Sequence, residues 1–307
     1  MKKRALALVC ALTFGALTLS ACGGASGEPT QASVPAETQA AEESASAGTV
    51  AAEAEEPETA QTGEKGTVTV AATPVPHAEI LEAAKPLMEE KGWTLEVVEL
   101  TDYVQPNEVV ESGDIDANYF QHINYMESYN EEKGTHLVSA GEIHYEPLGI
   151  YPGKESDLNN ISDGAEIAVP NDTTNEGRAL LLLQENGLIT LDPEAGITAT
   201  VMDITENPHN LEIVELQAEQ VARTLPDVAF GVVNGNYALQ AGLSTSDAVA
   251  LETADSEAIQ QYVNVIAVKE GNENKEGIQA LVEVLKSDEI RTFINDTYQG
   301  SVVPYEE

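Results

Sequence analysis

The sequence predicts an α/β protein whose parallel sheets are covered by helices on both faces. Short β-rich runs alternate with amphipathic helical patterns from about residue 66 to the C-terminus, which is typical of this class. Hydrophobic residues make up 42% of the 307 residues, enough for a packed core. The alternating part spans roughly 240 residues, which suffices for two ordinary domains.

Each element follows from its local pattern. Runs rich in β-branched and apolar residues predict strands at Thr67–Ala72, Thr94–Leu100, Ile115–Phe120, Ile167–Val169, Leu211–Leu216, Val228–Val233 and Tyr262–Val268, and an extended segment at His136–Ile150. Apolar residues three and four apart predict helices at Ala78–Lys91, Gln121–Lys133, Asn175–Glu185, Lys275–Leu285 and Asp288–Tyr298. We find no internal repeat that would indicate a repeat architecture.

Charge and composition exclude several function classes. The chain has 53 acidic and 14 basic residues, a formal charge of −39, which argues against nucleic acid or an anionic membrane surface as partner. The only cysteines, Cys10 and Cys22, cannot form a disulfide framework or a Cys-rich zinc site. The sequence contains no GxSxG or HExxH motif, and His136 and His144 are poorly spaced for a metal. We therefore expect no enzyme, catalytic residue, metal or cofactor.

Residues 1–21 have the pattern of a secretory signal peptide. A basic start precedes an apolar run, Ala5–Leu19, that is short for a membrane-spanning helix. Leu19-Ser20-Ala21-Cys22 resembles the bacterial lipobox, which implies cleavage before Cys22 and acylation of its sulfur. The alternative is an ordinary signal peptide in which Cys22 is incidental.

Residues 22–65 are expected to form a lipidated cysteine followed by a disordered acidic linker. From Gly23 to Glu64 the chain has no aromatic or basic residue, so it cannot bury enough apolar surface to fold. An Ala/Glu-rich helix is the alternative, but prolines such as Pro35 and Pro57 interrupt it.

Arg178 is the candidate anchor for a carboxylate. It lies directly after the strand Ile167–Val169, where Thr173 and Glu176 have the spacing of a capping box. A guanidinium in the first turn of a helix adds a planar fork to the positive helix end, and ligands in open α/β sheets bind at this end of the strands. The alternative is a surface ion pair with Glu176 or Asp172.

Aromatic residues gather at one expected strand-to-helix junction. Phe120, His122 and Tyr125 could line an apolar cavity with a few polar tips, and Tyr103 ends the preceding strand. Ordinary core packing is the alternative for these rings.

Asn234 and Asn264 lie at or within β-rich runs, where asparagine is disfavoured unless its amide has partners. A bound zwitterion would supply them, the oxygen accepting from the ammonium and the nitrogen donating to the carboxylate. A capping or turn role is the alternative, especially for Asn234 beside Gly235.

Five blocks occur in a fixed order along the chain: TPVPHAEIL, DYVQPNEV, GDIDANYFQH, AVPNDTTNEGRALLLLQ and YVNVI. Together they resemble the methionine-binding lipoproteins of bacterial ABC importers, the NlpA or MetQ family, over essentially all of Thr67–Glu307. The resemblance implies a type II-like, two-lobed periplasmic-binding-protein fold. Two α/β domains with parallel-dominated mixed sheets would be joined by two crossovers, near Tyr151–Ser162 and near Asp255–Tyr262.

The resemblance also assigns roles and bounds. The ligand carboxylate would meet Arg178 in the motif that begins at Asn175, Asn234 and Asn264 would bind the polar end, and the thioether would lie among Tyr103, Phe120, His122 and Tyr125. Lobe 1 is expected at 66–152 and 260–307, and lobe 2 at 153–259.

The implied function is capture of methionine, or a related amino acid, outside the membrane by a lipid-anchored monomer. An ABC permease and its ATPase subunit would be the partners, and the lipid would be the only contact with the membrane. Another amino acid, a methionine-containing short peptide, and a non-transport surface adhesin are the alternatives.

Overall fold

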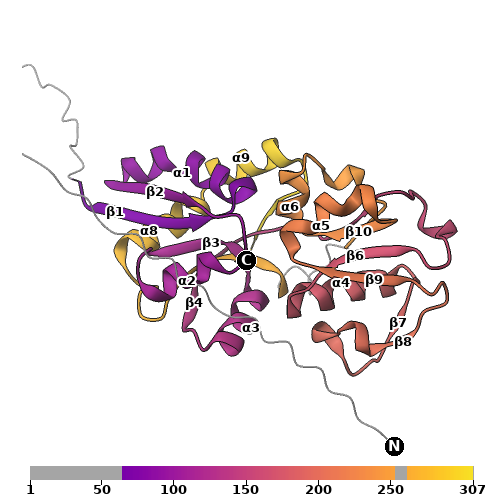
Figure 1. Cartoon of the computed structure of the whole chain (residues 1–307). Coiled ribbons are helices and arrows are strands. Elements are labelled where there is room, and N and C mark those ends of the chain that lie inside the picture. The colour runs from indigo at the N-terminus through magenta and orange to yellow at the C-terminus, as the bar shows by residue number, and fades with distance from the viewer. Residues whose placement is uncertain (1–63, 253–260, 307) are drawn as a thin grey trace, which may run out of the picture. The chain divides into compact units, whose positions relative to one another are not determined.

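The computed structural model describes residues 64–252 and 261–306. The expected signal peptide, Cys22 and nearly all of the acidic linker lie outside these residues. The described strands form two larger sheets and one two-stranded ribbon (Figure 1).

The first sheet has six strands in the order β13-β4-β12-β3-β1-β2. Its strands are β1 (Gly66–Ala72), β2 (Trp93–Glu99), β3 (Ala117–His122), β4 (Leu137–Tyr145), β12 (Val263–Lys269) and β13 (Val303–Pro304). β1 pairs in parallel with β2 and β3, whereas β12 runs antiparallel to β3 and β4.

The second sheet has five strands in the order β11-β5-β10-β6-β9. Its strands are β5 (Gly149–Pro152), β6 (Glu166–Pro170), β9 (Glu212–Leu216), β10 (Phe230–Val233) and β11 (Ala250–Leu251). β6 pairs in parallel with β9 and β10, and β5 runs antiparallel to β10 and β11. The ribbon consists of β7 (Thr190–Leu191) and β8 (Ile204–Glu206).

Helices cover both faces of each sheet. The α-helices are α1 (Glu79–Glu90), α2 (Gln105–Ser112), α3 (Ile123–Lys133), α4 (Thr173–Glu185), α5 (Ala218–Thr224), α6 (Gly235–Gln240), α8 (Glu276–Leu285) and α9 (Asp288–Tyr298). The short helical turns are η1 (Pro74–Ala78), η2 (Leu158–Asn160), η3 (Gly196–Thr198), η4 (Val201–Asp203), η5 (Leu225–Asp227) and η6 (Thr245–Asp247).

Alternating side chains of the central strands divide each core into two layers. On β12, Ile266 and Val268 pack in the cluster of α1, α8 and α9, whereas Val263 and Val265 pack in the cluster that contains residues of α2 and α3. On β6, Ile167 faces the α4 layer and Ala168 faces α5 and α6. Both faces are therefore buried, which explains why these strands read as continuous apolar runs.

The mixed α/β prediction is confirmed, but parallel pairs do not dominate. β12 and β5 each run antiparallel to both neighbours, because the chain returns to the first sheet at β12 and enters the second at β5. The strand order also moves the first crossover. Gly149–Pro152 belongs to the second sheet, so the chain changes sheets between Tyr145 and Gly149, before the expected bound at 152.

We propose that lobe 2 begins at this earlier point. The expected return, near Asp255–Tyr262, lies largely outside the described residues. β11 belongs to the second sheet and β12 to the first, so the return falls between Leu251 and Val263.

The sequence patterns predict the long elements and miss the short ones. Helices α2, α5 and α6 were not expected, because each is short and lacks a clear apolar stripe. Helix α4 begins two residues before the expected Asn175. Asp172 is its N-cap, with the carboxylate accepting from the Asn175 amide at 3.0 Å. Glu176 does not complete the expected capping box, because its carboxylate accepts from the Val201 amide instead. Of the helices in the described ranges, none has the length and apolar character needed to cross a bilayer.

Candidate ligand-binding site

One cavity brings together all eight side chains that the sequence predicts as ligand-binding. Its walls are Tyr103, Phe120, Gln121, His122, Tyr125, Glu146, Asn175, Arg178, Asn234, Gly235, Asn236 and Asn264. These residues come from both larger sheets and the segments that follow their strands. The space that remains between them is about 20 Å³, room for roughly one water molecule.

Arg178 is buried in this wall and is not on the surface. Its side chain is held by Glu252: Nη2 lies 2.5 Å from Oε2, and Nε lies 3.1 Å from Oε1. Nη2 also donates to the main-chain carbonyl of Glu146 at 3.0 Å. The Tyr262 ring stacks on the guanidinium at 4.0 Å. The expected alternative, a surface pair with Glu176 or Asp172, is therefore wrong.

Electrostatics hold this pair in its charged form. Burial alone would lower the pKa of Arg178, but the Glu252 carboxylate outweighs burial and the pKa is raised. Burial raises the pKa of Glu252, but Arg178 outweighs it and the net pKa is lowered. Within the described residues, no group accepts a hydrogen bond from Nη1 of Arg178, so this nitrogen is left for a ligand.

The amide side chains divide into those that are satisfied and those that are not. Asn175 uses both ends: Oδ1 accepts from Asn234 at 2.7 Å and from His122 at 3.2 Å, and Nδ2 donates to Asp172 at 2.8 Å. In contrast, Oδ1 of Asn234 and Nδ2 of Asn236 are buried and have no hydrogen-bond partner among the described residues. A buried amide group without a partner is costly, so these two atoms indicate where a polar ligand would bond.

Asn264 lines the cavity and its Oδ1 is 3.1 Å from Nε2 of His77, so its nitrogen is the end left to donate to a ligand. The two predicted asparagines therefore differ in polarity: Asn234 offers an acceptor, and Asn264 offers a donor. The turn or capping alternative holds in part, since Asn234 is the N-cap residue of α6, but its side chain makes no cap hydrogen bond.

Three rings line the opposite part of the cavity. The ring centroids of Tyr103, Phe120 and Tyr125 lie 5.6 to 6.0 Å apart, and the rings form a small separate cluster. Two hydroxyls fix the cluster: Tyr103 donates to Asn236 at 2.6 Å, and Tyr125 donates to the Tyr103 carbonyl at 2.9 Å. This is an apolar slot with polar edges, a usual form of a small-molecule site.

His122 connects the slot to the amides. It is the N-cap of α3, where Nδ1 accepts from the Tyr125 amide at 3.1 Å, so Nε2 carries the proton and donates to Asn175. Burial, and next the charge of Arg178, lower the pKa of His122 to about 3. The imidazole is therefore neutral at neutral pH.

Sequence reasoning missed five residues at this site. Gln121, Glu146, Gly235 and Asn236 line the cavity, and Glu252 holds Arg178 from outside it. Gln121 and Gly235 are each next to a predicted site residue, and Asn236 lies two residues from Asn234, so all three could have been found by proximity in the sequence. Glu252 had no local signal because its partner Arg178 is 74 residues away. Glu146 bonds to His144, two residues before it, but this spacing alone does not distinguish it from the many other acidic residues.

A cluster of possible metal ligands lies behind the cavity wall. The donor atoms of His77, His144 and Glu146 all lie within 4.8 Å of one another, and all three residues are buried. Sequence spacing did not predict this cluster, since His77 and His144 are brought together only by the pairing of the first sheet. The structure favours a hydrogen-bonded network here, as argued below.

Comparison with known proteins places the chain in a family. A family model described as NlpA lipoprotein matches residues 68–306. The methionine-binding lipoprotein MetQ of Bacillus subtilis is 42% identical over 255 residues, which are 81% of this chain and 91% of that protein. The D-methionine-binding lipoprotein MetQ of Escherichia coli K12 is 41% identical over 229 residues, 73% of this chain and 83% of that protein.

Solved structures agree with the two-lobed prediction. A lipoprotein from Ruminococcus gnavus is 65% identical, with a TM-score of 0.77 over 78% of this chain and 99% of its own. A nutrient-binding protein from Burkholderia cenocepacia, solved bound to methionine, is 42% identical, with a TM-score of 0.74 over 78% of this chain and 100% of its own.

Proposed function

The chain belongs to the NlpA lipoprotein family, and we propose that it captures methionine outside the membrane and delivers it to an ABC importer. One observation carries this proposal: a buried guanidinium and a ring-lined slot share one cavity between two sheets. The chain would bind and release its ligand without a chemical step. The relatives whose names specify methionine support the choice of ligand.

Each part of a methionine has a matching group in the cavity. We assign the carboxylate to Arg178, through its Nη1, and to the amide nitrogen of Asn264. The thioether would lie among Tyr103, Phe120 and Tyr125, where sulfur against ring edges contributes about 0.3–1.5 kcal/mol per contact. His122 and Asn175 would act by positioning, because their polar atoms are already engaged by protein groups.

The remaining space of about 20 Å³ admits neither a free amino acid nor a peptide before the walls separate, so the choice of a free amino acid rests on the relatives named for methionine. The adhesin alternative would have been favoured by an arginine pointing away from the cavity, and Arg178 lines it. Entry of a ligand requires the walls to separate, and the two crossovers between the sheets are the natural hinges. A monomer tethered by Cys22 would then present the loaded lobes to a permease.

Mass spectrometry of the small molecule that co-purifies with the native protein tests this function. The protein is purified without its first 22 residues, washed, and denatured to release its ligand. We expect methionine at close to one per chain. A chain carrying Arg178→Lys should release none, whereas Arg223→Lys, at an exposed position on α5, should release as much as wild type. Release of a different compound class would contradict the proposal.

A further inference from the structure

Glu146 is a buried carboxylate in the cavity wall. The residue directly follows β4 and is only 6% exposed. Arg178 donates to the main-chain carbonyl of this same residue, so the guanidinium and Glu146 are neighbours. Two groups that bind the carboxylate and the ammonium of one α-amino acid must be neighbours in this way, because both charges sit on one carbon.

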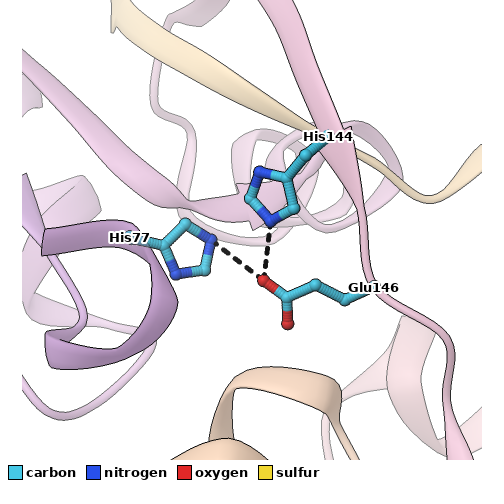
Figure 2. A group of neighbouring side chains, drawn as sticks. All are labelled: His77, His144 and Glu146. Carbon is cyan, nitrogen blue, oxygen red and sulfur yellow. Dashed lines mark hydrogen bonds and ion pairs between the residues drawn. The ribbon is translucent and has the colours of Figure 1, made fainter. Parts of the chain in front are cut away.

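Two histidines hold this carboxylate from behind. Nε2 of His144 lies 2.7 Å from Oε1 of Glu146, and Nε2 of His77 lies 3.4 Å from the same oxygen (Figure 2). His77 comes from η1 and His144 from β4, so the first sheet and its preceding turn together fix the position of the carboxylate.

The hydrogen-bond pattern assigns a proton to Nε2 of both rings. Nε2 of His77 faces two oxygen acceptors, on Glu146 and Asn264, so it must be the donor. Its Nδ1 then accepts from the Thr73 hydroxyl at 2.7 Å. His144 repeats the arrangement, with its Nδ1 accepting from the Tyr119 hydroxyl. Every ring nitrogen is satisfied in this network without a metal ion.

These histidines bond to Glu146 but do not neutralise it. Burial lowers the pKa of His77 to about 4 and that of His144 to about 3, so both are neutral at neutral pH. Arg178, whose charge also acts on Glu146, is already paired with Glu252. Burial also raises the pKa of Glu146 itself. An ionised carboxylate in this position therefore lacks a cation of its own, which is costly in a buried site.

An acceptor without a donor lies in the same wall. Oδ1 of Asn234 is buried, and no residue in the described ranges donates a hydrogen bond to it. The next residue, Gly235, approaches Glu146 so closely that an added Cβ would lie 2.9 Å from Oε2 and 2.8 Å from the Glu146 Cβ. Glycine thus lets the Asn234 segment pack directly against the carboxylate. A buried carboxylate without a cation of its own and an amide oxygen without a donor are the partners that an ammonium group requires.

We propose that Glu146, held in place by His77 and His144, is the counter-ion of the ligand's α-ammonium group, with Oδ1 of Asn234 as the second acceptor. The inference rests on the proposed function and adds a chemical requirement to it. The ligand must carry a free, protonated amine next to its carboxylate. The inference therefore excludes as ligands N-acylated methionine and a C-terminal peptide residue, whose nitrogen is part of an amide.

Calorimetry with two ligands tests the inference, using protein freed of ligand by unfolding and refolding. The ligands are methionine and 4-(methylthio)butanoate, which keeps the thioether and carboxylate and lacks the amine. Wild type should bind methionine about 10- to 100-fold more tightly, the range expected for losing a charged hydrogen bond. If wild type binds neither compound, the proposed function fails. If it binds both within threefold, the proposed function stands and the inference is overturned.

The variant Glu146→Gln keeps the shape and removes the charge. The variant should bind methionine about 10- to 100-fold more weakly than wild type does. It should bind 4-(methylthio)butanoate as tightly as wild type or more tightly, so that the affinities for the two ligands converge. Glu142→Gln, on β4 and partly exposed, is the matched control and should bind as wild type does. An equal loss for both ligands in Glu146→Gln would show a merely structural role and overturn the inference.

The same protein is assayed for bound zinc by elemental analysis, before and after a chelator. We expect no stoichiometric zinc and no change in methionine affinity. Zinc at one per chain in wild type, and its absence from the His77→Gln or His144→Gln variant, would assign the cluster to a metal and contradict the counter-ion role. If Glu146→Gln fails to fold, Glu146→Asp, which withdraws the carboxylate by one methylene, is compared in its place and should weaken the binding of methionine without weakening that of 4-(methylthio)butanoate.

Discussion

Arg178 on α4 and Glu252 at the end of β11 form a buried two-pronged ion pair, in which both Nε and Nη2 of the arginine face one carboxylate. Tyr145, the last residue of β4, donates to the same carboxylate at 2.6 Å. The pair therefore joins the second sheet to the first. Glu252 occupies the Nε–Nη2 edge of the guanidinium, and Arg178 also lines the cavity.

Replacing Arg178 by lysine should abolish tight methionine binding. An ammonium cannot bond Glu252 and a ligand carboxylate at once, because it lacks the planar fork. We expect a loss of about 2–5 kcal/mol in binding free energy, as for other broken buried charge pairs. Titration calorimetry measures it, with Arg223→Lys as the control that should retain wild-type affinity. Binding within threefold of the wild-type affinity would show that Arg178 does not bind the ligand carboxylate.

Replacing Phe120 by alanine should lower the preference for methionine over alanine as ligand. The ring fills the slot assigned to the thioether, so its loss removes apolar contact that alanine never makes. Phe293→Ala is the matched control, since Phe293 packs against the core near α9 and does not line the cavity. Competition binding should show a smaller methionine-to-alanine ratio only for Phe120→Ala. An unchanged ratio would place the thioether elsewhere.

Acid should destabilise the fold through three buried histidines. The pKa values of His77, His122 and His144 are lowered by burial to about 4, 3 and 3, below the usual 6.5. Below pH 6.5 the unfolded chain therefore binds protons that the folded chain does not. Their contribution to stability is complete above pH 6.5 and is lost as the pH falls toward 4.

Three such protons change the free energy of unfolding by at most about 4 kcal/mol per pH unit. The raised pKa values of Glu146 and Asp172, caused mainly by burial, act in the opposite direction and reduce it. Urea unfolding at pH 7 and pH 5 measures the change. His144→Gln should show a shallower slope, whereas His209→Gln, at a partly exposed position, should not. Equal stability at both pH values in wild type would contradict the buried, neutral assignment.

Replacing Gly177 by alanine should destabilise the protein despite alanine's higher helix propensity. An added Cβ would lie 2.1 Å from the main-chain oxygen of Ile197, where helix α4 packs against η3. Overpacking of this kind costs about 1–3 kcal/mol, more than the propensity gain of about 1 kcal/mol. Glu185→Ala, at an exposed position on the same helix, should change the unfolding free energy by less than about 0.5 kcal/mol. Increased stability in Gly177→Ala would show that the two segments are less tightly packed.

Replacing Cys22 by serine should release the protein from the membrane and abolish labelling by radioactive palmitate. Cys10→Ser is the control, because Cys10 lies within the expected signal peptide and would be removed with it. Membrane fractionation of cells that express each variant measures the effect. Retention of Cys22→Ser in the membrane fraction would exclude the lipid as the only anchor.

The parts of the site that share a local motif could be predicted from the sequence. Asn175 and Arg178 occupy the first turns of one helix, and Phe120, His122 and Tyr125 surround one strand-to-helix junction. Their side chains converge because these two junctions meet at the cavity. Tyr119 alternates with Phe120 along β3 and faces the other side of the strand, where it donates to His144.

The long-range partners could not be predicted. Glu252 is 74 residues from Arg178, and in a chain this acidic many carboxylates were equally plausible partners. Asp172 and Glu176, the nearer candidates, are engaged by main-chain amides of α4 and of the segment after η3. The histidine cluster depends on β4 and η1 meeting at Glu146, which no local pattern encodes.

Calorimetric titration of methionine into wild-type protein tests the central claim most directly. The protein is first unfolded and refolded to remove any ligand that it carries from the cell. We predict a saturable heat at one methionine per chain. No heat, together with a melting temperature that does not respond to methionine, would contradict the account.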